Sequence, residues 1–204
     1  MRNILFPIFL TLLFAKLYHQ ASPSIKLIVE KIDVNYNASI VDWNHVLNLL
    51  PNDTCYFSAN VTFLSKLDTF FFLYSISLMK GKGKYETFFK NGPTNICSSF
   101  KNLKGNAIVR TILNSKNFSK KKFPTSCPIE PGFFYIEDFK IDEKLLSFNN
   151  FEAKFIVKIE LSKKVGTALV NFINLKVYAE LKDLEKWEKE NKEKLAKLNK
   201  TMEN

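Results

Sequence analysis

The chain has 204 residues, of which 46% are hydrophobic and 25% are charged, and it contains only six Gly and seven Pro. This composition is typical of one globular domain and excludes a fibrous, low-complexity or intrinsically disordered protein. The net charge is +10, and 20 residues are Phe. So many Phe residues indicate either an aromatic core or a cavity for an apolar molecule, and the sequence leaves both open.

The first 21 residues have the layout of a secretory signal peptide. Arg2 precedes an apolar run from Ile4 to Phe14, and small and polar residues follow. The alternative is a membrane anchor, but a spanning helix needs about 20 apolar residues, and this run is shorter. We expect cleavage from Ala21 to Ser24 and a mature protein that is secreted and extracellular.

Alternating apolar and polar residues predict strands in the first half of the chain. Residues 24–37 put Ile28 and Ile32 on one face, and residues 55–64 turn Cys55 and Phe57 inward. Residues 67–80 are apolar on both faces, as in a central strand. A basic turn with two glycines follows this third strand.

The second half contains a helix and the clearest strands. Apolar residues recur at intervals of three and four from Ile96 to Leu113, which predicts a helix with Thr94 as its N-cap. The strand at 133–141 is expected to turn Phe133 and Tyr135 to the same face. Residues 151–181 alternate on both sides of a polar turn at Gly166, so they predict a long antiparallel hairpin.

The composition changes abruptly after the hairpin. Residues 181–204 are rich in Lys and Glu with a thin apolar stripe, which predicts a mostly solvated helical tail rather than a coiled coil. Residues 22–180 are therefore expected to form one β domain, with one inserted helix and this tail after it.

In a secreted protein the N-x-Ser/Thr sites can be glycosylated and the three cysteines can form disulfides. Five Asn residues head an N-x-Ser/Thr sequence: Asn37, Asn52, Asn60, Asn117 and Asn199. Asn37 and Asn60 fall on the polar faces of predicted strands, where a glycan fits. A bridge between Cys97 and Cys127 would close a loop of about 30 residues, and two free buried thiols are the alternative. Cys55 is then a buried thiol.

Motifs for catalysis, metals and phosphate are absent from the sequence. After signal removal His45 is the one remaining His, without a nucleophile motif or further His ligands beside it. No phosphate-binding glycine motif accompanies the basic turn. We therefore expect no enzyme activity, no metal and no other cofactor, and His45 is expected at the surface or in a hydrogen bond.

Two lysine clusters stand out from the other basic residues. They are Lys80, Lys82 and Lys84, and Lys120, Lys121 and Lys122. Nucleic acid is not the expected partner, because the chain is predicted to be secreted and has no recognised nucleic-acid-binding motif. The clusters are either solvated loop tips or a basic rim that meets lipid headgroups at the mouth of a cavity.

The segment "KGKGKYETFFKNGPTNICSSFKNL" and the later "FPTSCPIEPGFFYIEDFKID" resemble a large insect family of secreted proteins. That family is related to the lipid-recognition (ML) domain and the ganglioside-activator proteins, and it includes chemosensory B proteins. The resemblance covers residues 25–180. The residues that carry it are Cys97, Cys127, Pro128, Gly132, Tyr135 and Ile136.

The resemblance implies an immunoglobulin-like β-sandwich of the ML type, with Cys97 bridged to Cys127. It also implies a non-enzymatic carrier or sensor of a lipid or other hydrophobic small molecule, in chemosensation or innate recognition, where a membrane receptor would be a further partner. The ligand-binding residues expected between the sheets are Phe57, Val61, Phe63, Phe133, Tyr135, Phe155, Val157 and Ile159. The alternative is a secreted protein with a filled core that acts through its surface on a protein partner.

Overall fold

The computed structural model describes residues 25–50, 53–101, 119–140 and 152–202. The predicted signal peptide, residues 1–21, lies outside this part of the chain. The same is true of two sequon residues, Asn52 and Asn117.

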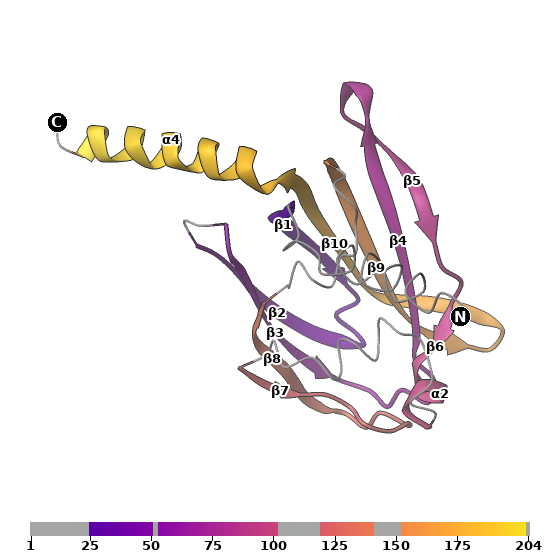
Figure 1. Ribbon diagram of the computed structural model, residues 1–204. Helices are drawn as coiled ribbons and strands as arrows, with labels where there is room; N and C mark the ends of the chain where they lie inside the picture. The colour runs from indigo at the N-terminus through magenta and orange to yellow at the C-terminus, as the bar shows by residue number, and fades with distance from the viewer. Residues whose placement is uncertain (1–24, 51–52, 102–118, 141–151, 203–204) are drawn as a thin grey trace, which may run out of the picture.

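Two antiparallel sheets face each other (Figure 1). The first sheet contains β1 (Ile25–Tyr36), β4 (Phe71–Lys80), β5 (Lys84–Lys90), β6 (Thr94–Asn95), β9 (Ala153–Val165) and β10 (Ala168–Asp183). Its order is β1-β10-β9-β4-β5, and β6 pairs with the first residues of β4. The second sheet contains β2 (Val41–Leu49), β3 (Cys55–Phe63), β7 (Lys120–Lys122) and β8 (Gly132–Lys140), in the order β2-β3-β8-β7.

The predicted all-β sandwich with an inserted helix and a helical tail is confirmed. The helical elements are the 3-10 turn η1 (Gly81–Gly83), α2 (Ile96–Lys101) and α4 (Leu184–Met202). The predicted hairpin is β9–β10, and Gly166 has the positive φ of 60° that its tight turn requires. The strand expected at 67–80 is β4, which lies between β9 and β5 as a central strand does.

Three β-bulges change which residues face the core. A bulge inserts one residue into a strand, so the alternation of faces reverses beyond it. In β1 the register shifts between Val29 and Lys31, so Leu27 and Val29 are buried where Ile28 was predicted. In β10 the shift between Asn171 and Ile173 buries Phe172 beside Ile173.

The third bulge lies between β3 and β8. Phe57 pairs with Phe139, but Ala59 pairs with Ile136, so one extra residue lies on the β8 side. Asp138 adopts a positive φ of 49° there, and its backbone N–H donates to the Ser58 hydroxyl at 2.9 Å. The alternation of faces predicted from Phe139 therefore assigns the residues before the bulge to the wrong face of β8.

The core between the sheets centres on Phe172, which is 1% exposed. Its ring contacts Phe63 from the second sheet and Phe70, with centroids 6.1 and 6.0 Å apart. A second cluster lies at the other end of the first sheet and contains Ile25, Leu27, Phe155, Ala179 and Leu181. Val157 packs against this second cluster.

The helix α2 is joined by a disulfide to the segment between β7 and β8 of the second sheet. Cys97 and Cys127 are bonded, with their Cα atoms 5.5 Å apart, so the predicted bridge is confirmed. The N-cap is Asn95 rather than the predicted Thr94, because the Asn95 side-chain oxygen accepts the Cys97 N–H at 2.9 Å. Thr94 instead pairs with Phe72 as part of β6. The described helix ends at Lys101, and the rest of the predicted helix lies outside the described residues.

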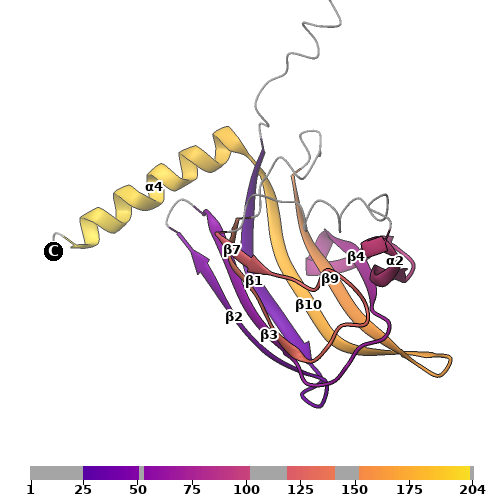
Figure 2. The ribbon, with the colours of Figure 1, turned by 90° about the horizontal axis from the view of Figure 1, so that it is seen from below.

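The tail helix α4 continues directly from β10 and projects away from the sandwich (Figure 2). The predicted tail began at residue 181, but β10 continues through Asp183, whose carboxylate caps the helix by accepting the Lys186 N–H at 3.1 Å. The Trp187 indole N–H donates to Asp53, and Lys26 lies 4.9 Å from the Trp187 ring. None of the helices described combines the length and apolar character needed to span a bilayer.

Removing the disulfide should lower the free energy of unfolding by about 3.5 kcal/mol. The bridge closes a loop of 30 residues and so restricts the unfolded chain. Denaturant titration of the Cys97→Ser/Cys127→Ser double variant measures this change. A loss below about 1 kcal/mol would show that the bridge does not stabilise the fold in this way.

Cys55 is free and buried, and burial raises the pKa of its thiol to about 11. An unfolded Cys has a pKa of about 8.5, so the folded state holds the proton more tightly. The stability gained from the neutral thiol is present below pH 8.5 and is lost as the pH rises towards 11. We expect wild type to lose stability relative to Cys55→Ala over this window in parallel denaturant titrations. If the difference in unfolding free energy between wild type and Cys55→Ala does not change with pH, the raised pKa of the Cys55 thiol is wrong.

Candidate functional site

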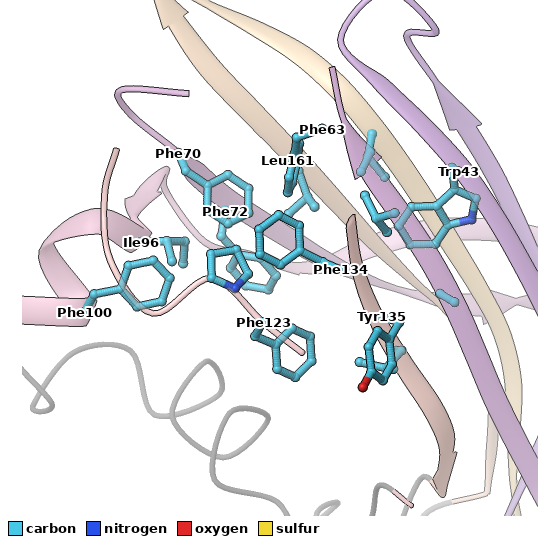
Figure 3. A pocket seen from close by; sticks show the side chains of 15 residues that line it. Trp43, Phe63, Phe70, Phe72, Ile96, Phe100, Phe123, Phe134, Tyr135 and Leu161 are labelled. Atoms are coloured by element: carbon cyan, nitrogen blue, oxygen red, sulfur yellow. The ribbon is translucent and has the colours of Figure 1, made fainter. Parts of the chain in front are cut away.

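An apolar pocket of about 240 Å³ lies between the two sheets (Figure 3). Aromatic side chains supply much of its wall, and almost all of its surface is apolar. The second sheet contributes Trp43 from β2, Val61 and Phe63 from β3, and Phe134 from β8. The first sheet faces them with Phe72 from β4, Leu161 from β9 and Ile173 from β10.

One end of the pocket is formed by the two segments that the disulfide joins. Ile96 and Phe100 come from α2, and Phe123 and Pro124 come from the segment that follows β7. Figure 3 shows Ile96 and Phe100 together, with Phe123 apart from them. Ile96 is 4% exposed and packs against Phe72. The bridge therefore tethers the helix to the segment that follows β7.

Ring contacts fix the shape of the wall. Phe63 and Phe134 meet edge to face with centroids 5.5 Å apart, a favourable geometry for an aromatic pair. The Lys122 ammonium lies 5.5 Å from the Phe134 ring, close enough for a cation–π contact. Because these contacts hold the rings in place, the rings do not fill the space between the sheets.

The structure brings together only some of the eight residues expected to bind a ligand. Val61, Phe63 and Tyr135 line the pocket. Ile159 packs beside it, against Phe72 and Ile96. The remaining four do not line it: Phe57, Phe133, Phe155 and Val157.

Each of these four has another place in the fold. Phe155 is buried in the second cluster, and Val157 packs against that cluster. Phe57 is buried next to the His45 ring, with centroids 6.1 Å apart. Phe133 is 47% exposed and stacks on Tyr135 at 5.8 Å, because the bulge in β8 turns Phe134 to the core instead.

Sequence reasoning missed several wall residues for three different reasons. Phe134 was missed because the bulge in β8 reverses the alternation of faces, so the pattern assigned Phe133 to the core instead. Trp43 was missed because β2 was not predicted, although Val41, Trp43 and Leu47 share one parity and are more buried than their neighbours. Ile96 and Phe100 belonged to the predicted helix, but nothing in the local pattern showed which way that helix would face.

The two lysine clusters lie in different places. Lys80 and Lys84 pair across the turn between β4 and β5, and Lys80 forms a 2.6 Å ion pair with Glu86. Because Phe72 lies eight residues before Lys80 on the same strand, this turn is about 26 Å from that wall residue. Lys82 lies in the same turn, but its side chain is not among those described.

The other cluster adjoins the pocket. Lys120, Lys121 and Lys122 form β7, the edge strand that leads into Phe123. Lys120 lies 3.6 Å from Glu137, so part of its charge is balanced. Of the six predicted rim lysines, those of β7 are the ones that lie next to the pocket wall.

The sequons that the structure describes are accessible. Asn37 is exposed in the turn between β1 and β2, where its side-chain oxygen accepts hydrogen bonds from the Ser39 N–H and hydroxyl. Asn60 is exposed on β3. The Asn199 side chain lies outside the described residues.

His45 is hydrogen-bonded within β2. Its Nδ1 accepts the Trp43 indole N–H at 3.2 Å, and this bond orients Trp43 at the pocket wall. Across the residues described, no three His, Cys, Asp or Glu side chains form a group that could hold a metal ion.

Comparison with protein families gives a match to part of the chain. A family model described as "Protein of unknown function (DUF1091)" matches residues 72–156, from β4 to the first residues of β9. This stretch includes both cysteines of the disulfide and the whole of β8. A search of curated proteins found no match. Over residues 72–156 the chain is therefore similar to a family of ML-domain-like proteins.

Proposed function

We propose that this chain is a secreted, non-enzymatic binding protein for a lipid or other hydrophobic small molecule. The observation that carries the proposal is the apolar pocket of about 240 Å³ between the sheets. The similarity to ML-domain-like proteins is compatible with a binding role.

The size of the pocket limits what it can hold. A dry cavity of about 150 Å³ lined by apolar side chains binds benzene, and pockets for drug-sized ligands span about 300–1,000 Å³. The pocket described here falls between these sizes. It suits a small apolar molecule or one segment of an aliphatic chain.

The driving force for such a ligand is burial of its apolar surface. Each Å² removed from water contributes about 25 cal/mol before the costs of association are subtracted. Because the wall offers almost no polar surface, selection would depend on the shape of the ligand rather than on directed hydrogen bonds. The Lys120, Lys121 and Lys122 cluster next to the pocket would meet a polar head.

Secretion and the absence of catalysis are parts of the same proposal. The exposed positions of Asn37 and Asn60 and the disulfide fit an extracellular protein. His45 Nδ1 is already engaged by Trp43, which suits a structural role for this imidazole. From the resemblance, we place this binding protein in chemosensation or innate recognition, with a membrane receptor as a further partner.

Native mass spectrometry of the secreted protein, followed by extraction and identification of bound molecules, is the direct test. A stoichiometric lipid or other apolar ligand is the expected result. An apo mass that stays unchanged after incubation with lipids and hydrophobic odorants would favour the alternative, a filled-core protein that acts through its surface.

Filling the pocket should remove ligand binding without unfolding the protein. Val61→Phe adds volume to a wall residue that faces the open space, so we expect affinity to fall at least tenfold with little loss of stability. Trp43 reports binding directly, because Trp187→Phe leaves it as the sole Trp. Quenching of Trp43 by a brominated fatty acid measures the affinity.

Val157→Phe is the matched control because it makes the same change in the second cluster, away from the pocket. Overpacking there should cost about 1–3 kcal/mol of stability and leave the affinity unchanged. If Val61→Phe binds like wild type, or if only Val157→Phe loses binding, the ligand does not occupy this pocket.

A further inference from the structure

A row of aromatic rings runs from the pocket to the open edge of the first sheet. Phe72 lines the pocket, and its ring centroid lies 5.6 Å from that of Tyr74. Tyr74 in turn lies 5.5 Å from Phe89 on β5. The strand β5 is the edge of this sheet (Figure 1), and Phe89 is 43% exposed.

The three rings lie on the same face of the sheet. Phe72 and Tyr74 are two residues apart on β4, and Phe89 pairs with Ile76, the next residue of that parity. Phe89 is therefore the diagonal neighbour of Tyr74, within reach of an aromatic side chain. The row leaves the pocket at Phe72 and crosses from β4 to β5.

The row ends in apolar surface that is open to solvent. Phe88, the residue before Phe89, is 73% exposed, the largest value among the exposed large hydrophobic residues. It is the extra residue of a register shift between β4 and β5, since Ile76 pairs with Phe89 and Ser77 pairs with Thr87. Two adjacent exposed Phe side chains on an edge strand leave apolar area uncovered that continues from the pocket.

The pocket is too small to enclose a long ligand, so the apolar surface that continues from it can hold the rest of such a ligand. At about 240 Å³ the pocket is smaller than the sites that enclose drug-sized ligands, which begin near 300 Å³. A longer ligand must place its remainder outside the pocket. The aromatic row offers it apolar surface that adjoins the wall at Phe72.

The geometry points to a second subsite, formed by Tyr74, Phe88 and Phe89, for the outer part of a long linear aliphatic ligand whose inner end fills the pocket. This inference rests on the function proposed above. A single flexible chain can follow a row one ring wide, whereas a fused-ring ligand or a lipid with two chains has too large a cross-section. Phe89 would then set the length of chain that the protein prefers.

A series of linear alcohols from octanol to octadecanol tests the subsite, with the full mature chain and competition against a fluorescent fatty-acid probe. For wild type, affinity should rise about twofold per added methylene through the longer members of the series, because a methylene that lies on exposed rings loses only part of its contact with water. For Phe89→Ser, octanol should bind as in wild type, and octadecanol about fivefold more weakly. Phe88→Ser should give the same pattern with a smaller change.

Phe133→Ser is the matched control, because Phe133 is also a half-exposed Phe stacked on a Tyr. It should leave the chain-length dependence unchanged. The subsite is overturned if the Phe89→Ser curve follows wild type, or if Phe133→Ser and Phe89→Ser weaken octadecanol equally. Octanol binding with a wild-type curve that is flat at longer lengths also overturns it, while the pocket proposal survives.

Two further outcomes distinguish the pocket function, the subsite and an interface between copies of the chain. If no alcohol binds wild type at any length, both the pocket function and the subsite fail. If Phe89→Ser keeps the chain-length dependence but turns an oligomer into a monomer in sedimentation experiments, the exposed rings are an interface between copies of the chain. That result would also overturn the subsite.

Discussion

The disulfide between Cys97 and Cys127 is the constraint on which the pocket depends. The two sheets touch through β1 and β2 at one edge of the sandwich, and at the other edge the bridge ties α2 to the segment before β8. Ile96 and Phe100 come from the helix that holds Cys97, and Phe123 and Pro124 come from the segment that leads to Cys127. A helix of six residues has little stability of its own, so its position is set by this bond and by Ile96.

The core beside the pocket shows why the space stays open. Phe172 reaches the core through a bulge and contacts Phe63 and Phe70, and Phe63 contacts Phe134. Each ring is therefore held by other rings rather than by a ligand. A wall that is already organised loses little side-chain entropy on binding, which favours affinity for a weakly interacting apolar molecule.

Period-two patterns predicted strands because the alternation of faces along a strand follows directly from burial. The β9–β10 hairpin and the inward face of β3 were predicted in this way, and β4 was predicted as a central strand because it is apolar on both faces. The sandwich and the Cys97–Cys127 bridge followed from the family resemblance, and the bridge also from the expected secretion. The site was harder to predict, because three bulges reverse the alternation. Phe133 in place of Phe134 is one result, and Ile28 in place of Leu27 is another.

Bulges depend on pairing between distant segments, so no local pattern reveals them. Asp138 can hold a positive φ because the Ser58 hydroxyl, 80 residues away, accepts its N–H. The split of the apolar residues into two clusters is equally non-local, and it separates Phe155 and Val157 from the pocket although they lie on the same face of β9 as Leu161. On β4 and β9 the residues that line the pocket are Phe72, near the start of β4, and Leu161, near the end of β9.

The pocket also has a mechanical consequence. It is a partly open space between the sheets that side chains do not fill, and unfolding eliminates poorly filled space of this kind. High hydrostatic pressure should therefore compress the empty protein around the space between Trp43 and Phe72. A bound apolar molecule would occupy that volume, so ligand occupancy and resistance to compression are two expressions of the same packing defect.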